Sequence, residues 1–427
     1  MINKTIGKLY FYFNKKMNFF YATLSFMKKY VTLLREEIVL RRLSTIQLIS
    51  YFGAWFSNIA IYTLLLELNV SAAIVAFVAM LNFLAGVIQA PFSGPIIDRV
   101  HPKRLMLFLI LLEIVATIAL VMVNQLADLW LLYLLVFVKM AAASFYFTTE
   151  MSLLPKILDG DKLRIANELH SIIWSLSYTL GMAISGFVVY WLGIKAAFIL
   201  DGSMFIIAFG LLYTTAIEVE ILKIEQNIIT MMKDTFTYLK KTPKAFHLML
   251  LHSFVGLTAF DALVALMVDQ YYASIVATSL ALGLLHSARA VGLVVGPVFI
   301  GKWINNRRLV YVFIAQGVAL FLWAYAMHNF YLSLLASVVV GFFTTTLWSY
   351  SYTLLQKNID KKYYGRIVAY NDMLFLSAAA FTSYMIGFLA THSFSLEAIT
   401  AIMGIGFLLG AIYYRYILKN QNIKEIT

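Results

Sequence analysis

Long apolar segments, separated by short polar ones, follow one another along the chain from residue 44 onward. Twelve of these segments approach or exceed the roughly 20 residues that a helix needs to cross the hydrocarbon core of a bilayer. The pattern therefore predicts an all-α membrane protein with twelve transmembrane helices. We expect the spans at 44–66, 71–97, 105–123, 128–151, 168–191, 194–216, 247–268, 278–300, 309–327, 330–352, 367–390 and 395–417.

The composition agrees with a protein that crosses the membrane many times. Of the 427 residues, 62% are hydrophobic and 13% are charged, whereas soluble domains are about half apolar and about a quarter charged. The chain has no cysteine, which excludes disulfides, thiol catalysis and cysteine-bound metals. No nucleophile–base pair, metal cluster or nucleotide loop is visible, so we expect neither an enzyme nor a cofactor.

The distribution of positive charges between the two sides of the membrane indicates the topology. With the N-terminus inside, all but three of the 33 Lys and Arg residues fall in cytoplasmic segments. The exceptions are Lys139 and Arg289 within spans and Lys195 on the other side. Such asymmetry is the positive-inside pattern. It predicts cytoplasmic termini in a bacterial-type inner membrane, and it explains the net charge of +12 without nucleic acid.

The longest polar interruption, 218–246, divides the spans into two sets of six. We therefore expect an N-terminal bundle at 44–217, a cytoplasmic linker at 218–246, a C-terminal bundle at 247–418 and a tail at 419–427. The first 43 residues form a basic, aromatic extension. Two interpretations of it stay open: an interfacial helix on anionic lipid, or a chain whose true start is Met27.

The two halves repeat a short motif. Leu153-Leu-Pro-Lys-Ile-Leu-Asp159 follows the fourth span, and Leu354-Leu-Gln-Lys-Asn-Ile-Asp360 follows the tenth. An arginine follows each copy, at Arg164 and Arg366. The repetition predicts a duplication, with two pseudo-symmetric bundles of six helices.

The loop Gly94-Pro-Ile-Ile-Asp98-Arg99-Val-His-Pro-Lys103-Arg104 joins the second and third spans. It resembles the G-x-x-x-D-R-x-x-x-[RK]-[RK] loop of the major facilitator superfamily. That resemblance implies a gate in which Asp98 faces the start of the eleventh span near Arg366 and Arg99 pairs with Glu150 when the inside is closed. The gating residues that we expect are Gly94, Asp98, Arg99, Lys103, Arg104, Glu150 and Arg366.

Other stretches resemble one branch of that superfamily, which contains macrolide-efflux proteins and the enterobactin exporter. They are Arg41-Arg-Leu…Trp55, Leu154-Pro-Lys…Asn167, Tyr238-Leu-Lys-Lys-Thr-Pro243 and Gly365-Arg366-Ile-Val-Ala369. The resemblance implies transport by alternating access between two rocking bundles. The first stretch departs from the branch at Ala54, which stands where the branch usually has an acid that serves proton coupling.

Four charged residues lie well inside the expected spans: Glu113, Lys139, Asp261 and Arg289. Each costs about 2.5–3.5 kcal/mol at mid-helix on insertion scales, which favours a functional role. A static ion pair that only fixes helix packing is the alternative. Asp201 is expected to be a structural cap at the start of the sixth span.

The family resemblance places the first, fourth, seventh and tenth spans around a central cavity. It therefore puts Lys139 and Asp261 on the pathway, with Asn58 and Trp348 as neutral lining. We expect Arg289 to pair with Asp261, and Asp261 to be the coupling carboxylate. Glu113 is the second choice.

Together these features predict a monomeric secondary transporter that exports a hydrophobic or amphiphilic small molecule, of drug or siderophore type, in exchange for protons. One alternative is an importer or symporter of a small metabolite on the same fold, since a fold does not fix direction. Another is a membrane receptor or scaffold without transport.

Overall fold

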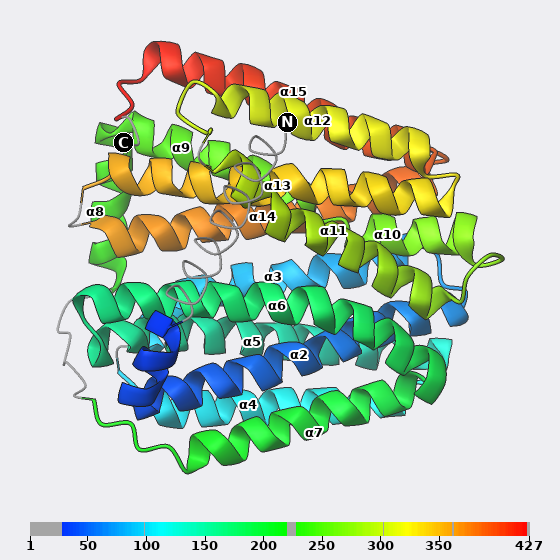
Figure 1. Cartoon of the computed structure of the whole chain (residues 1–427), viewed down its shortest axis with the longest axis horizontal. Coiled ribbons are helices and arrows are strands. Elements are labelled where there is room, and N and C mark those ends of the chain that lie inside the picture. Colours follow the sequence, from blue (N-terminus) through cyan, green and yellow to red (C-terminus); the bar gives the residue numbers. More distant parts are fainter. Residues whose placement is uncertain (1–27, 98, 220–227, 302, 361–362, 425–427) are drawn as a thin grey trace, which may run out of the picture.

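The computed structural model of the chain describes residues 28–97, 99–219, 228–301, 303–360 and 363–424 (Figure 1). In this part of the chain, 12 helical segments are long and apolar enough to cross a membrane. Figure 1 shows their helices running along the long axis of the molecule in two bundles, which lie one above the other in this view. The prediction of an all-α fold with twelve spans in two six-helix bundles is confirmed.

The first bundle contains six spans, joined by short connections. Two short 3-10 turns, Leu120–Met122 and Leu126–Asp128, lie between its third and fourth spans. The helices are α2 (Ile38–Glu67), α3 (Ala72–Ile97), α4 (Pro102–Ala119), α5 (Leu129–Ile157), α6 (Gly160–Leu192) and α7 (Ile194–Tyr213).

The amphipathic helix α8 (Ile228–Lys241) leads into the second bundle. The first span of this bundle is discontinuous and consists of α9 (Pro243–Ser253), η3 (Phe254–Thr258), α10 (Asp261–Met267) and η4 (Val268–Tyr272). The other five are α11 (Thr278–Ile300), α12 (Leu309–Ala326), α13 (Phe330–Asn358), α14 (Tyr364–Thr391) and α15 (Leu396–Asn420).

Several helices extend beyond the spans that the apolar pattern predicts. Helix α2 begins at Ile38 instead of residue 44, and α13 continues to Asn358 instead of residue 352. Apolar content marks only the part of a helix that lies in hydrocarbon, while its hydrogen bonds continue into the polar headgroup region. The added turns place the Leu-Leu-x-Lys repeat at the same position in each bundle, at the ends of α5 and α13.

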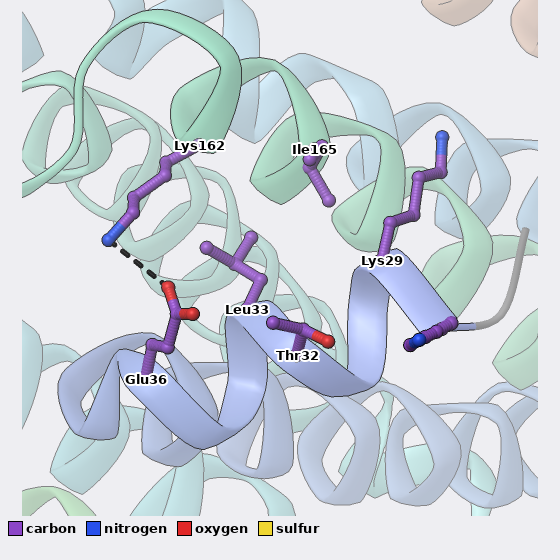
Figure 2. A pocket seen from close by; sticks show the side chains of 7 residues that line it. Lys29, Thr32, Leu33, Glu36, Lys162 and Ile165 are labelled. Atoms are coloured by element: carbon purple, nitrogen blue, oxygen red, sulfur yellow. Dashed lines mark ion pairs between the residues drawn. The ribbon is translucent and has the colours of Figure 1, made fainter. Parts of the chain in front are cut away.

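Residues 28–36 form a helix that packs on the beginning of α6. The side chains of Tyr30 and Leu33 are buried there, and Lys29 Nζ lies 2.6 Å from Glu168 Oε2. This hydrogen bond raises the pKa of Lys29 above its ordinary value. Figure 2 shows the ion pair between Lys162 and Glu36 across the same contact. The extension is thus fixed to α6 from residue 28, whereas residues 1–27 lie outside the described part.

Two helix pairs join the bundles: α3 packs on α14, and α6 packs on α11. We call the end of the molecule with the loops 99–101 and 303–308 the basic end, and the other the opposite end. Near the opposite end, a Cβ added to Gly186 of α6 would lie 2.8 Å from the Ser279 carbonyl oxygen, and one added to Gly283 of α11 would lie 2.8 Å from that of Met182. The bundles therefore meet there backbone to backbone, and a larger side chain would separate them.

We predict that Gly283→Leu opens the opposite end, because overpacking a close contact costs about 1–3 kcal/mol. In this cysteine-free chain, spin labels on Leu192→Cys and Ile275→Cys report the separation of α6 and the second bundle at that end. The distance between the labels is expected to lengthen in Gly283→Leu. The control is Gly210→Leu on α7, where an added Cβ meets no atom within 4 Å. Equal distances in the two variants contradict the prediction.

Candidate functional site

The first group of charges inside the spans is a buried ion pair within the first bundle. Lys139 Nζ of α5 lies 2.5 Å from Asp201 Oδ2 of α7, and the two side chains are 6% and 0% exposed. The hydroxyl of Ser57 on α2 donates a hydrogen bond to the same oxygen. Gly53 leaves room for the carboxylate, since a Cβ there would lie 2.7 Å from Asp201 Oδ1. Three helices are thus joined by one carboxylate.

Glu113 of α4 adds a second carboxylate to this pair. Its side chain is buried, and it lies close enough to Lys139 and Asp201 to interact electrostatically with both. One cation balances only one of two carboxylates. The cluster is therefore electrically neutral when it carries one additional proton, and neutrality is what burial in a low-dielectric interior favours.

The structure corrects two expectations about this group. Lys139 was expected on the central pathway beside Asp261, but its amine lies on Asp201 inside the first bundle. Asp201 was expected to cap the start of the sixth span, but it lies two turns inside α7, which begins at Ile194. The Lys139 error arises because assigning a whole helix to a cavity does not determine which face of the helix is turned toward it. The Asp201 error arises because the helix begins seven residues before it.

The second group of charges lies where the two bundles meet. The helical span 243–272 is broken after Thr258, and Asp261 is the first residue of the helix that resumes. Its carboxylate lies 3.9 Å from Nδ1 of the buried His286 on α11. It also interacts electrostatically with Tyr62 of α2 and Tyr178 of α6 in the other bundle. Discontinuous membrane helices occur where transporters bind substrates or ions.

Arg289 stabilises the break instead of pairing with Asp261. Its Nη2 donates to the carbonyl oxygen of Thr258 at 3.1 Å, and its guanidinium lies 4.8 Å from the centre of the Phe260 ring. No ion pair between described residues joins Arg289 to Asp261. The predicted pairing is wrong because the break frees a carbonyl group inside the membrane, and this group needs a donor.

Aromatic rings cluster on both bundles, near Tyr178 in the first and near His252 in the second. The ring of Trp55 on α2 meets that of Tyr178 edge to face at 4.8 Å, and Trp174 stacks on Tyr178 at 5.5 Å. In the second bundle, Trp348 stacks on Tyr352 at 5.1 Å and remains 42% exposed. These rings offer flat apolar surfaces with polar edges.

Asn58 and Trp348 were both predicted to line the pathway. Asn58 lies on α2, one turn from Trp55, and its half-buried side chain has an Oδ1 with no hydrogen-bond partner among the described residues. Trp348 lies on α13, as expected for a residue of the tenth span.

Two further polar residues of the second bundle were not among the predicted site residues. His252 is fully buried, and its Nδ1 lies 2.8 Å from the Ser351 hydroxyl. Its ring meets the stacked rings of Trp348 and Tyr352 edge to face. Asp372 on α14 accepts a hydrogen bond from Asn371. Among the described residues, no group of three His, Asp or Glu side chains is arranged to hold a metal ion.

The predicted gate is only partly visible. Asp98 and the surroundings of Gly94 lie outside the described residues, so the contact of Asp98 with Arg366 stays a prediction. The Arg99 side chain is exposed, and Glu150 is buried with no hydrogen-bond partner for its Oε2 among the described residues. No ion pair joins these two in the part of the chain that the structure describes, and their pairing in a state closed at the basic end also stays a prediction.

The remaining gate residues lie near helix ends. Lys103 Nζ donates to the Tyr213 carbonyl oxygen at 2.8 Å and so joins the start of α4 to the end of α7. Arg104 is exposed. The guanidinium of Arg366, on the first turn of α14, lies 5.8 Å from the centre of the Tyr363 ring.

A comparison with protein families decides what kind of molecule this is. The family model of the Major Facilitator Superfamily matches residues 43–272 and 248–425. The chain belongs to the major facilitator superfamily. Its twelve spans, its two bundles and its broken seventh span are therefore features of a transporter-family protein.

Individual members of the superfamily are similar to the chain at low identity. An uncharacterized MFS-type transporter, YfiS, of Bacillus subtilis (strain 168) is 25% identical over 182 residues, which are 42% of this chain and 43% of that protein. The alignment thus spans less than half of this curated relative.

Solved structures of the superfamily match over nearly the whole chain. A bacterial homologue of the human lysosomal transporter Spinster, inward-facing and occupied, gives a TM-score of 0.72 at 12% identity, covering 90% of this chain and 96% of that one. A D-xylose-proton symporter gives 0.71 at 11% identity, with 88% and 97% covered. The nucleoside transporter NupG gives 0.66 at 13% identity, with 90% and 100% covered.

We predict that replacing one residue of the buried Lys139–Asp201 pair destabilises this transporter-family protein far more than replacing both residues. Lys139→Met alone and Asp201→Asn alone should each cost about 3–5 kcal/mol, because each leaves a buried charge without its partner. The double variant Lys139→Met/Asp201→Asn should recover most of that loss. Thermal unfolding of the purified protein in detergent measures the difference.

The matched control is the exposed pair Lys162–Glu37, with 2.7 Å between Nζ and Oε1 and side chains 46% and 31% exposed. Lys162→Met and Glu37→Gln should each cost less than about 1 kcal/mol. If the single variants of the buried pair are no less stable than those of the exposed pair, the buried pair does not stabilise the fold.

Proposed function

We propose that the chain is a secondary transporter that exports a hydrophobic or amphiphilic small molecule in exchange for protons. The observation that supports this most is the broken seventh span, which brings Asp261 to the contact between the bundles, near Tyr62 and Tyr178 of the first bundle. The groups around a carboxylate in this position change when the bundles rock. The groups around a packing contact within one bundle stay the same.

Asp261 meets the physical requirements of a coupling carboxylate. Its side chain is 19% exposed, so it is not sealed within the packed core. Within the second bundle the structure places His286 and Arg289 around the break, and from the first bundle it places Tyr62 and Tyr178. Rocking separates the carboxylate from one set of these groups. The groups that surround the carboxylate then differ between the two states, as coupling requires.

The substrate class follows from the surfaces beside this carboxylate. The rings of Trp174 and Trp348 are 43% and 42% exposed and present apolar faces, and the orphan Oδ1 of Asn58 is an acceptor for a polar group. A molecule with a flat apolar part and a few polar groups fits such a lining. The resemblance to the branch of the macrolide-efflux proteins and the enterobactin exporter supports export of drug-like or siderophore-like compounds.

The placement in the membrane follows from the charges of the loops. We propose that the basic end is cytoplasmic, with both termini inside a bacterial inner membrane, because Lys and Arg concentrate at that end. A monomer contains both bundles and the complete site between them.

Symport of a small polar metabolite is the second candidate. It is favoured by the similarity to the structures of a D-xylose-proton symporter and a nucleoside transporter. A receptor or scaffold without transport is disfavoured, because it has little use for Asp261 and Arg289 at mid-membrane.

We predict that Asp261→Asn binds and exchanges substrate but no longer concentrates it. The carboxamide keeps the shape of the carboxylate and cannot carry the coupled proton. The measurement is uptake of a substrate panel into inside-out vesicles with and without an imposed proton gradient, together with proton release on addition of substrate. The control is Asp269→Asn, the same change at an exposed residue of the same span, which should pump like the wild type.

Uphill pumping by Asp261→Asn under a proton gradient alone overturns its coupling role. If Glu113→Gln abolishes pumping instead, the proton is carried by the cluster around Lys139. Uptake that follows the gradient in the symport direction favours the second candidate.

A further inference from the structure

A pocket of about 680 Å³ opens at the basic end of the second bundle, between the start of α12 and the end of α15. Figure 1 shows these two helices side by side at the edge of the molecule, away from the first bundle. The pocket is therefore remote from the central site. Its lining residues are Asn306, Arg307, Val310, Tyr311, Arg415, Leu418, Lys419, Gln421, Asn422 and Ile423.

The lining carries positive charge that the described part of the chain does not neutralise. Arg307, Arg415 and Lys419 are exposed, and none of them forms an ion pair with a described residue. Arg415 and Lys419 are four residues apart on α15 and so lie on one face of the helix. None of the residues that line the pocket is acidic.

The wall of the pocket is a fixed part of the fold. The end of the chain is tied back over the bundle, because Asn306 Nδ2 donates to the Lys424 carbonyl oxygen at 3.2 Å and Lys424 N donates to Asn358 Oδ1 at 2.9 Å. Ile423 packs against the hydrophobic core between these two contacts. Gln421 and Asn422, which precede these contacts, line the pocket together with the three cations.

An apolar surface continues from the pocket along both helices. Exposed apolar side chains recur at helical spacing on α12 and on α15. Each helix therefore has an apolar face that is suited to contact with acyl chains. These residues are Tyr311, Ile314, Val318 and Leu322 on α12, and Ile405, Leu409, Ile412 and Tyr416 on α15.

We propose that this pocket binds the phosphate headgroup of an anionic phospholipid, with its acyl chains along the exposed faces of α12 and α15. Cations and amides without acidic partners suit a phosphate, and basic pockets between membrane helices bind anionic headgroups. The lipid connects α12, α15 and the tail, which are the outer elements of the second bundle.

A second pocket at the basic end lacks this chemistry, although it also contains lysines. It has about 380 Å³ and lies between the helix 28–36 and α6 (Figure 2). Lys29 there pairs with Glu168, and Lys162 pairs with Glu36 and Glu37. Two of the three lysines that line this pocket are thus already paired, and its lining also contains the acidic Glu36, so we assign no anion to it.

The test is binding of short-chain phosphatidylglycerol to the purified full-length protein, measured by native mass spectrometry and by the rise in melting temperature. Phosphatidylglycerol should bind saturably, while phosphatidylcholine and inorganic phosphate should not. Arg415→Gln/Lys419→Gln should weaken the affinity about 30-fold, which corresponds to about 1 kcal/mol for each cation removed. Arg415→Lys should retain most of the binding.

The control Lys240→Gln/Lys241→Gln removes the same charge from exposed positions of α8 and should leave the affinity within about twofold. Equal binding of phosphatidylcholine overturns the proposal, as does equal loss in both double variants. Inorganic phosphate that competes as well as the lipid shows an ion site instead of a lipid site, and this outcome also overturns it.

Discussion

The high cost of an unpaired charge or an unpaired backbone group in hydrocarbon governs this structure. Lys139 meets the constraint by pairing with Asp201, which also accepts from Ser57. Arg289 meets it through the Thr258 carbonyl group and the Phe260 ring. Each polar contact fixes the relative position of helices, because neither partner can leave without exposing the other to an apolar surrounding. The Lys139–Asp201 pair lies inside one bundle, whereas Arg289 lies where the two bundles meet. We therefore assign a structural role to the first and a role in transport to the second.

The pair of Lys139 and Asp201 lies inside one bundle, so it moves with that bundle as a unit. Asp261 lies at the contact between bundles, at a break that Arg289 stabilises. A span without a break would offer no free backbone groups there, and Arg289 would have no carbonyl to satisfy. The backbone contact of Gly186 and Gly283 closes the opposite end over this region. A rigid first bundle, a closable end and a carboxylate between them are the parts that alternating access needs.

The fold could be predicted from the sequence because the length of each apolar segment and the charge of each loop can be counted directly. This pattern is repeated over twelve segments. Family motifs likewise identified the superfamily, whose family model matches both halves of the chain. The pairing of side chains was not predictable in this way. Lys139 and Asp261 were assigned to one cavity from the helices that carry them, but the side of α5 that bears Lys139 faces α7. The break at Thr258 has no proline to signal it, and His252 acquires its environment only when Ser351 and Trp348 pack around it. Such contacts depend on helix rotation, which apolar periodicity determines poorly when a helix is apolar on all sides.

The central claim is that the two bundles rock around the site at Asp261, so that the two ends of the molecule open in alternation. It is tested most directly by measuring two distances between spin labels in the reconstituted protein. One pair, Asp161→Cys with Lys357→Cys, spans the basic end, and the other, Glu67→Cys with Thr391→Cys, spans the opposite end; all four residues are exposed. When the pH or the substrate concentration is changed, we expect one distance to lengthen as the other shortens, with the same midpoint, and Asp261→Asn to remove the response to pH. Distances that stay constant, or that change in the same direction, would contradict alternating access.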